Sequence, residues 1–126
     1  MVTGLYAGLL ALMLLGLLTA VIRRRLKYKV GLGDGGIKDL EQAIRAHGNF
    51  VEVVPYVLIL MFLLEAQGVQ PWFLHLYGIT LVVARLLHAW GLYTSPYRTF
   101  GRIVGILLCQ ILMFSGAILL IYKFMA

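Results

Sequence analysis

The stretch Met1–Ile22, MVTGLYAGLLALMLLGLLTAVI, carries no charged side chain and is followed directly by Arg23, Arg24 and Arg25. A bilayer core about 30 Å thick is crossed by about 20 apolar residues of helix. A cleavable signal peptide carries its positive charge before a shorter apolar run. Because the order here is the reverse, we expect a retained membrane-spanning helix over residues 2–25.

Three later stretches are long enough to cross a bilayer in the same way. The first is largely apolar over residues 46–64, the second starts at Pro71, and the third, Ile103–Tyr122, carries no charge. Proline is well tolerated in the first turn of a helix. We expect these three helices over residues 42–66, 71–93 and 100–123. The sequence therefore predicts an all-α membrane protein, with one domain over residues 1–126 folded as a four-helix transmembrane bundle.

The composition agrees with a membrane protein and argues against a soluble one. Only 13% of the residues are charged and 62% are hydrophobic, whereas a soluble domain carries about 25% charged residues. A net charge of +6 would suggest a nucleic-acid partner in a soluble protein. Here the basic residues lie beside apolar spans, so we expect contact with membrane lipid and no nucleic acid.

The distribution of lysine and arginine predicts the orientation of the chain. The first loop is basic and glycine-rich, which indicates a flexible polar segment, and the third loop holds Arg98 and borders Arg102, whereas residues 67–70 contain no lysine or arginine. Cytoplasmic loops carry the excess of basic residues. We therefore expect loops one and three in the cytoplasm, both termini on the other side, and, if the protein is bacterial, an inner-membrane location.

Polar side chains inside the spans are the strongest functional signal, because an ionisable group at membrane depth costs several kcal/mol unless it is paired. Arg45, Asn49 and Glu52 are spaced i, i+4, i+7 and so share one helix face. Arg85 and His88 are spaced i, i+3 on the third span. Antiparallel packing would bring both stripes to one depth, and we expect Glu52 to pair with Arg85.

These stripes predict a pocket inside the bundle near the cytoplasmic interface. Its arginines would hold carboxylates bidentately, Asn49 would take a peptide group and Glu52 an ammonium. Such a pocket suits a small zwitterionic ligand with several carboxylates. A purely structural Glu–Arg pair is the competing interpretation. The expected lining residues are Arg45, Asn49, Glu52, Arg85, His88 and Arg102.

The histidines and the single cysteine indicate neither a metal site nor a disulfide. His47, His75 and His88 lack the close spacing of a zinc motif, so we expect no metal site. Cys109 is the single cysteine; it cannot form an internal disulfide, and its apolar surroundings indicate packing.

Several motifs resemble those of one membrane-protein family. The run Arg45–Glu52, RAHGNFVE, followed by Val53-Val54-Pro55, looks like the second-helix signature of the MAPEG family, the membrane-associated proteins in eicosanoid and glutathione metabolism. The runs Ala84–His88, ARLLH, and Arg102–Gly105, RIVG, resemble its third- and fourth-helix motifs, and Gly31–Gly36 resembles the first loop of bacterial members. The resemblance covers nearly the whole chain.

The resemblance implies a homotrimer that binds glutathione as a co-substrate between neighbouring subunits. It implies a glutathione S-transferase, or a glutathione peroxidase, acting on a lipophilic electrophile or lipid hydroperoxide. Arg102 would stabilise the glutathione thiolate. Residues that would contact glutathione are Arg45, Asn49, Glu52, His88 and Arg102, with Arg23 by a looser alignment and Arg85 within the same pocket.

The chain departs from the family pattern at two places, and one role has two candidate residues. Gly48 stands where some members have a second arginine. Leu92 stands where eukaryotic members often have a tyrosine, so Tyr93, the next residue, would have to supply that contact. Arg98 competes with Arg102 for the thiolate role, and Gly105 after the latter favours Arg102.

Two other function classes fit a four-span chain. A non-catalytic lipid-binding scaffold would differ from the enzyme in binding no glutathione. A small multidrug exporter needs a membrane-embedded carboxylate in its first helix, and residues 1–22 contain none. The acceptor substrate, the balance of transferase and peroxidase activity, and the identity of the native thiol stay open.

Overall fold

The computed structural model describes residues 1–126 and contains four helices and no strands. All four helices are long and apolar enough to cross a membrane, so the predicted all-α, four-span fold is confirmed. Each helix contains one expected span; α1 runs on past residue 25 and α2 begins before residue 42. The helices are α1 (Val2–Tyr28), α2 (Lys38–Ala66), α3 (Pro71–Thr94) and α4 (Phe100–Met125).

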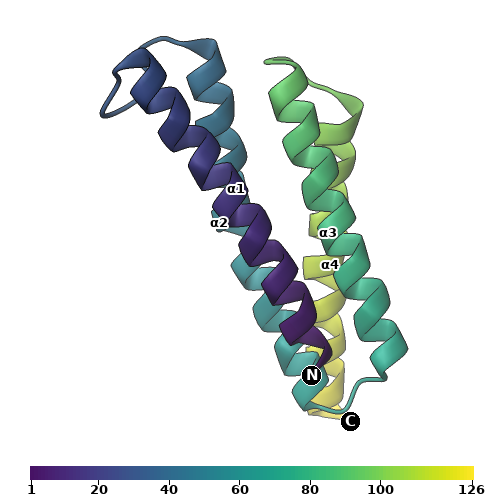
Figure 1. Cartoon of the computed structure of the whole chain (residues 1–126). Coiled ribbons are helices and arrows are strands. Elements are labelled where there is room, and N and C mark those ends of the chain that lie inside the picture. Colours follow the sequence, from purple (N-terminus) through teal and green to yellow (C-terminus); the bar gives the residue numbers. More distant parts are fainter.

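The helices are arranged as two hairpins. α1 packs against α2, and α3 packs against α4; α2 also contacts both α3 and α4, and α1 contacts α3. In Figure 1 the hairpins meet near the two termini, which lie at one end of the bundle, and they separate toward the opposite end. We call these the terminal end and the loop end. The loop end carries residues 29–37, between α1 and α2, and residues 95–99, between α3 and α4.

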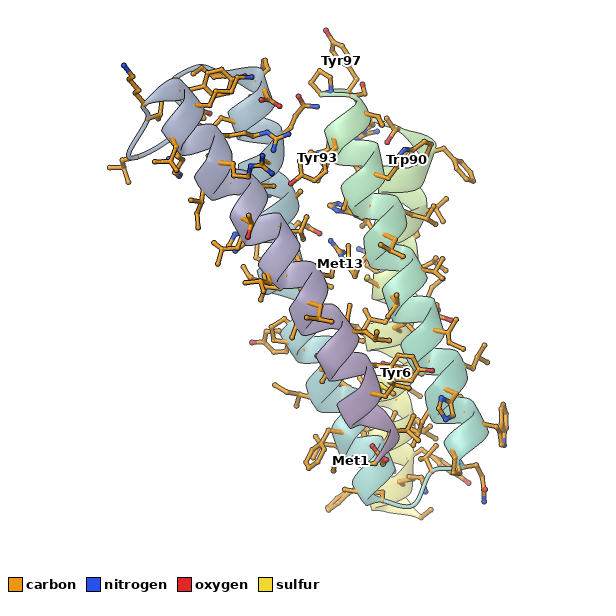
Figure 2. All side chains as sticks on the ribbon, viewed as in Figure 1. Met1, Tyr6, Met13, Trp90, Tyr93 and Tyr97 are labelled. Atoms are coloured by element: carbon orange, nitrogen blue, oxygen red, sulfur yellow. The ribbon has the colours of Figure 1, made fainter.

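The outside of the bundle is apolar. Only 27 of the 126 residues are buried, while large apolar side chains such as Leu12, Trp90 and Phe114 are mostly exposed. Figure 2 shows side chains projecting outward along all four helices. A continuous apolar surface of this kind is unfavourable in water. It is the surface expected of a bundle surrounded by lipid or by further subunits.

Glycines on facing helices let α3 and α4 approach closely. A Cβ atom added at Gly105 would lie 2.5 Å from the Ala84 carbonyl oxygen and 2.7 Å from His88 Cβ. One added at Gly91 would lie 2.7 Å from the Arg102 backbone nitrogen. No larger residue fits at these points without moving a helix. The first turns of α4 are therefore held directly against the polar part of α3.

The first loop has defined internal bonds although it was expected to be flexible. Arg25 Nη1 donates to the Gly33 carbonyl at 2.9 Å, and Asp34 Oδ1 accepts from the Gly36 N–H at 2.8 Å. At the start of α2, Asp39 accepts from Arg24 Nε and from the Tyr28 hydroxyl, each at 2.9 Å. These bonds connect the loop end of α1 to the start of α2.

The terminal end is held by a second polar network. The Glu65 carboxylate, from the last turn of α2, accepts from the backbone N–H groups of Val2 and Thr3 at 2.5 and 2.8 Å. The first N–H groups of a helix have no intrahelical partner, so Glu65 caps α1 from another helix. Nearby, the Tyr6 hydroxyl lies 2.9 Å from His75 Nδ1 on α3. Three helices are thereby joined at this end.

Candidate functional site

A buried arginine lies at the centre of the polar cluster. Arg85 on α3 is 1% exposed. Its Nη2 donates to Asn49 Oδ1 at 2.8 Å and lies 3.0 Å from His88 Nδ1, and its Nη1 donates to Cys109 Sγ at 3.6 Å. α2, α3 and α4 each contribute to this cluster. As expected, the antiparallel packing brings Asn49, Arg85 and His88 to one depth.

The expected ion pair between Glu52 and Arg85 is wrong. The ion pairs in the structure are Arg24–Asp39 and Lys38–Glu41, and Glu52 is exposed on the outer face of α2. Each helical residue turns by about 100°, so Glu52 lies about 60° further than Asn49 from the buried face of α2. The shorter amide side chain is therefore the one that reaches the arginine.

A polar cavity of about 90 Å³ opens between α2, α3 and α4 at the loop end. Arg45 enters it from α2 and Arg102 from the first turn of α4. Gln42 Nε2 donates to the Leu92 carbonyl at 2.7 Å and so connects α2 to α3 across it. Its single carboxylate, Glu41, pairs with Lys38 at 3.1 Å, so the cavity favours anions. The lining residues are Lys38, Glu41, Gln42, Arg45, Leu92, Pro96 and Arg102.

Local structure positions Arg102. Thr99 precedes α4, and its side-chain oxygen accepts from the Arg102 N–H at 3.3 Å, which caps the helix. Arg102 also lines a second hollow of about 400 Å³, together with Arg98 and three apolar residues of α4. Arg98 lines this second hollow but not the polar cavity. Arg102 therefore lies at the junction of the polar cavity and this second hollow, which we call the apolar groove of α4.

The single pocket expected from the sequence is divided, because Arg45 and Arg102 line this cavity and Asn49, Arg85 and His88 do not. Two further expected site residues lie away from both the cavity and the cluster. Arg23 is exposed and lines a groove along α1. Tyr93 packs its ring 5.2 Å from the Arg24 guanidinium, and in Figure 2 it projects between the two hairpins. Leu92, and not Tyr93, lines the cavity. Within one chain the tyrosine contact expected from the family pattern is therefore not supplied by Tyr93.

The structure adds residues that the sequence reasoning did not include. Gln42 and Lys38 line the polar cavity. A separate cavity of about 200 Å³ between α2 and α4 contains Cys109 and Gln110 beside Asn49 and Arg85. Gln110 interrupts an otherwise apolar span, and that polar side chain was the available signal. For Cys109 no sequence signal existed, because its partner is Arg85, 24 positions away.

The sequence matches the MAPEG family over residues 3–122, nearly the whole chain. The chain belongs to the MAPEG family. The resemblance inferred from its motifs is thus confirmed, and the polar cluster and the cavity lie on the matching segments.

Curated relatives of this MAPEG chain include the inner membrane protein YecN of Escherichia coli strain K12. The two are 43% identical over 98 residues, which cover 78% of this chain and 75% of the relative. The YecN protein of Escherichia coli O6:H1 matches with the same identity and coverage. With four apolar helices, this similarity supports an integral, multi-pass protein of the inner membrane.

Proposed function

We propose that this MAPEG chain is a membrane-embedded, glutathione-dependent transferase or peroxidase that acts on lipophilic electrophiles or lipid hydroperoxides. The observation that carries this proposal is the position of Arg102, which lines both the polar cavity and the apolar groove of α4. A hydrophilic thiol and a lipophilic acceptor have to meet at such a point. A binding protein with one ligand needs only one of these two environments.

The polar cavity suits the carboxylates of glutathione. Arg45 and Arg102 supply guanidinium groups from two helices, and Lys38 and Gln42 add further donors. Arginine binds carboxylates bidentately, with geometric as well as electrostatic preference. Asn49 and His88, which contact Arg85 beyond this cavity, would hold the peptide portion of glutathione.

Arg102 has sufficient charge to activate a thiol. A thiol with a pKa near 8.5 is only a few per cent ionised at pH 7. Lowering that pKa by about 2 units requires about 2.7 kcal/mol. A unit charge about 4 Å away contributes on the order of 4 kcal/mol at an effective dielectric constant of 20. The thiolate would then attack an electrophilic carbon or a peroxide oxygen of an acceptor in the α4 groove.

The active assembly is proposed to be a homotrimer. The polar cavity of about 90 Å³ is smaller than the roughly 300–1,000 Å³ of ordinary ligand pockets. Glu52 and Tyr56 are exposed side by side on α2, where an unpaired carboxylate at membrane depth would be costly. A neighbouring subunit would complete the cavity and cover Glu52, and Arg23 would come from that neighbour. Native mass spectrometry of the detergent-solubilised protein tests the trimer.

The proposed orientation places the loop end in the cytoplasm. Glutathione would then enter the polar cavity from the aqueous side, and the acceptor would arrive through the lipid beside α4. Labelling of single cysteines introduced at Gly33 and Gly68, in a Cys109→Ser background, with a membrane-impermeant maleimide tests this orientation. Only the Gly68 position should react from outside the cell, and reaction of Gly33 alone would reverse the assignment.

The test of function is an ultraviolet difference spectrum of the purified protein with added glutathione. A saturable thiolate band is expected from the unsubstituted chain and from Arg98→Ala, and its loss is expected from Arg102→Ala. Arg98 is the matched control because it shares the apolar groove but not the polar cavity. A band that persists in Arg102→Ala would refute the proposed mechanism. Absence of both band and binding in the unsubstituted chain would favour the non-catalytic lipid-binding scaffold.

A further inference from the structure

The buried guanidinium of Arg85 has no acidic partner. Neither ion pair of the chain involves it, and its Nε is buried without a hydrogen-bond partner. Its remaining nitrogens contact Asn49, His88 and Cys109. A cation at membrane depth is unfavourable unless an opposite charge or hydrogen-bond acceptors surround it. The cluster as it stands therefore carries an uncompensated positive charge.

Cys109 is the only side chain in contact with this guanidinium that can become an anion. Asn49 is a neutral amide, and His88 can only be neutral or cationic. Sγ of Cys109 accepts from Arg85 Nη1 at 3.6 Å. The thiolate is the form of cysteine that attacks other sulfur atoms. The Arg85 guanidinium therefore places a fixed positive charge beside the sulfur atom.

The sulfur can be reached from outside the bundle core. Cys109 and Arg85 line the cavity of about 200 Å³ between α2 and α4, together with Asn49, Gln110 and Met113. Gln110 is exposed at its edge and supplies an amide there. Cys109 itself is 2% exposed, so only a molecule that enters this cavity meets it. The lining is mixed, with Asn49, Arg85 and Gln110 polar and Val53, Ile106 and Met113 apolar, so a small molecule that carries both polar and apolar groups fits it.

We propose that Cys109 is a site of covalent modification that forms a mixed disulfide with a low-molecular-weight thiol. The Cys109 thiolate attacks one sulfur of a small-molecule disulfide, a new S–S bond forms to Sγ, and the original S–S bond breaks. The electron pair of that bond leaves with the second half of the reagent as its thiolate, which takes up the proton released from Cys109. The disulfide is the oxidant, and reduction by a free thiol reverses the step. Arg85 stabilises negative charge on the attacking and leaving sulfurs.

The experiment uses the full chain in detergent, reduced and then freed of reductant. It is treated with glutathione disulfide or with the small neutral bis(2-hydroxyethyl) disulfide, and its intact mass is followed. Cys109 is the single cysteine, so any disulfide adduct must be attached to it. One adduct per chain is expected, removable by dithiothreitol and absent from Cys109→Ser. If the folded chain stays unmodified by both reagents while the same chain unfolded in SDS reacts fully, Cys109 is a packing residue and the proposal is overturned.

The role of Arg85 is tested by comparing rates of adduct formation. Arg85→Gln is expected to slow the reaction about tenfold, because the guanidinium that stabilises negative charge on the attacking and leaving sulfurs is removed. Arg98→Gln, at an exposed arginine, is the matched control and should not change the rate. Equal rates in the unsubstituted and Arg85→Gln chains would contradict the assignment to Arg85. If Arg85→Gln fails to fold, the proposal is judged from the unsubstituted chain, by comparing adduct formation in its folded and its SDS-unfolded forms.

The inference rests on the proposed function only for the choice of glutathione disulfide as one of the two reagents. The neutral reagent requires no glutathione site, so its adduct would support the inference even where the ultraviolet band of glutathione is absent. An adduct with the neutral reagent but not with glutathione disulfide would keep the modification site and remove glutathione as its partner.

Discussion

Replacing Glu65 by alanine should weaken the terminal end of the bundle while leaving the loop end intact. The Glu65 carboxylate accepts from two α1 backbone N–H groups, at 2.5 and 2.8 Å. Loss of a helix N-cap costs typically about 1 kcal/mol, and a negative charge at a helix N-terminus adds about 0.3–1 kcal/mol. With two donors left without a partner, we expect Glu65→Ala to lower the free energy of unfolding by about 2–3 kcal/mol. Glu65→Gln keeps an oxygen acceptor but loses the charge, so its free energy of unfolding should lie between those of Glu65→Ala and the unsubstituted chain.

The assay is SDS-induced unfolding of the purified protein in mixed micelles, followed by circular dichroism. Glu41→Ala is the matched control, because Glu41 forms an exposed pair with Lys38 at 3.1 Å, and such pairs contribute only about 0–1 kcal/mol. Glu41→Ala should be the most stable of the three variants, Glu65→Gln intermediate and Glu65→Ala the least stable. Equal stability of Glu41→Ala and Glu65→Ala would refute the capping role.

The other expectations concern the polar layer of the bundle. Gly105→Ala should destabilise the chain by about 1–3 kcal/mol, because its Cβ would lie 2.7 Å from His88 Cβ. By contrast, a Cβ atom added at Gly8 meets nothing within 4 Å, so Gly8→Ala should stabilise α1 by up to about 1 kcal/mol. The same unfolding assay compares the two variants, and equal effects on stability would contradict the close α3–α4 contact. Asn49→Leu should cost about 2 kcal/mol, since it removes an acceptor from the buried Arg85 guanidinium, and should also weaken glutathione binding in isothermal titration calorimetry. Unchanged stability in Asn49→Leu would mean that Arg85 finds another partner.

Much of the cluster around Arg85 followed from spacing alone. The i, i+3 interval places Arg85 and His88 on one face of α3 whatever that helix packs against, and the cost of a polar group in the membrane turns that face inward. Of the stripe on α2, Asn49 reaches this face, whereas Arg45 and Glu52 are exposed. The choice of Asn49 over Glu52 as the partner of Arg85 could not be predicted. It depends on how α2 is rotated toward α3, a quantity decided by the summed packing of three helices. The rotation of α3 in turn places Leu92 on the polar cavity and Tyr93 against Arg24.

The sequence by itself determined that four helices form and where each begins and ends to within a few residues. The reason is local: in lipid a backbone must satisfy its own hydrogen bonds, so an apolar run of sufficient length has to be helical. Only the tertiary structure decided which polar groups meet. Arg102 reaches two different hollows, Glu65 caps a helix more than sixty residues before it, and Cys109 touches Arg85, because each contact joins groups on different helices. Such contacts depend on helix rotation and on the close approach that Gly91 and Gly105 permit. Neither can be predicted from the spacing of residues within a single helix.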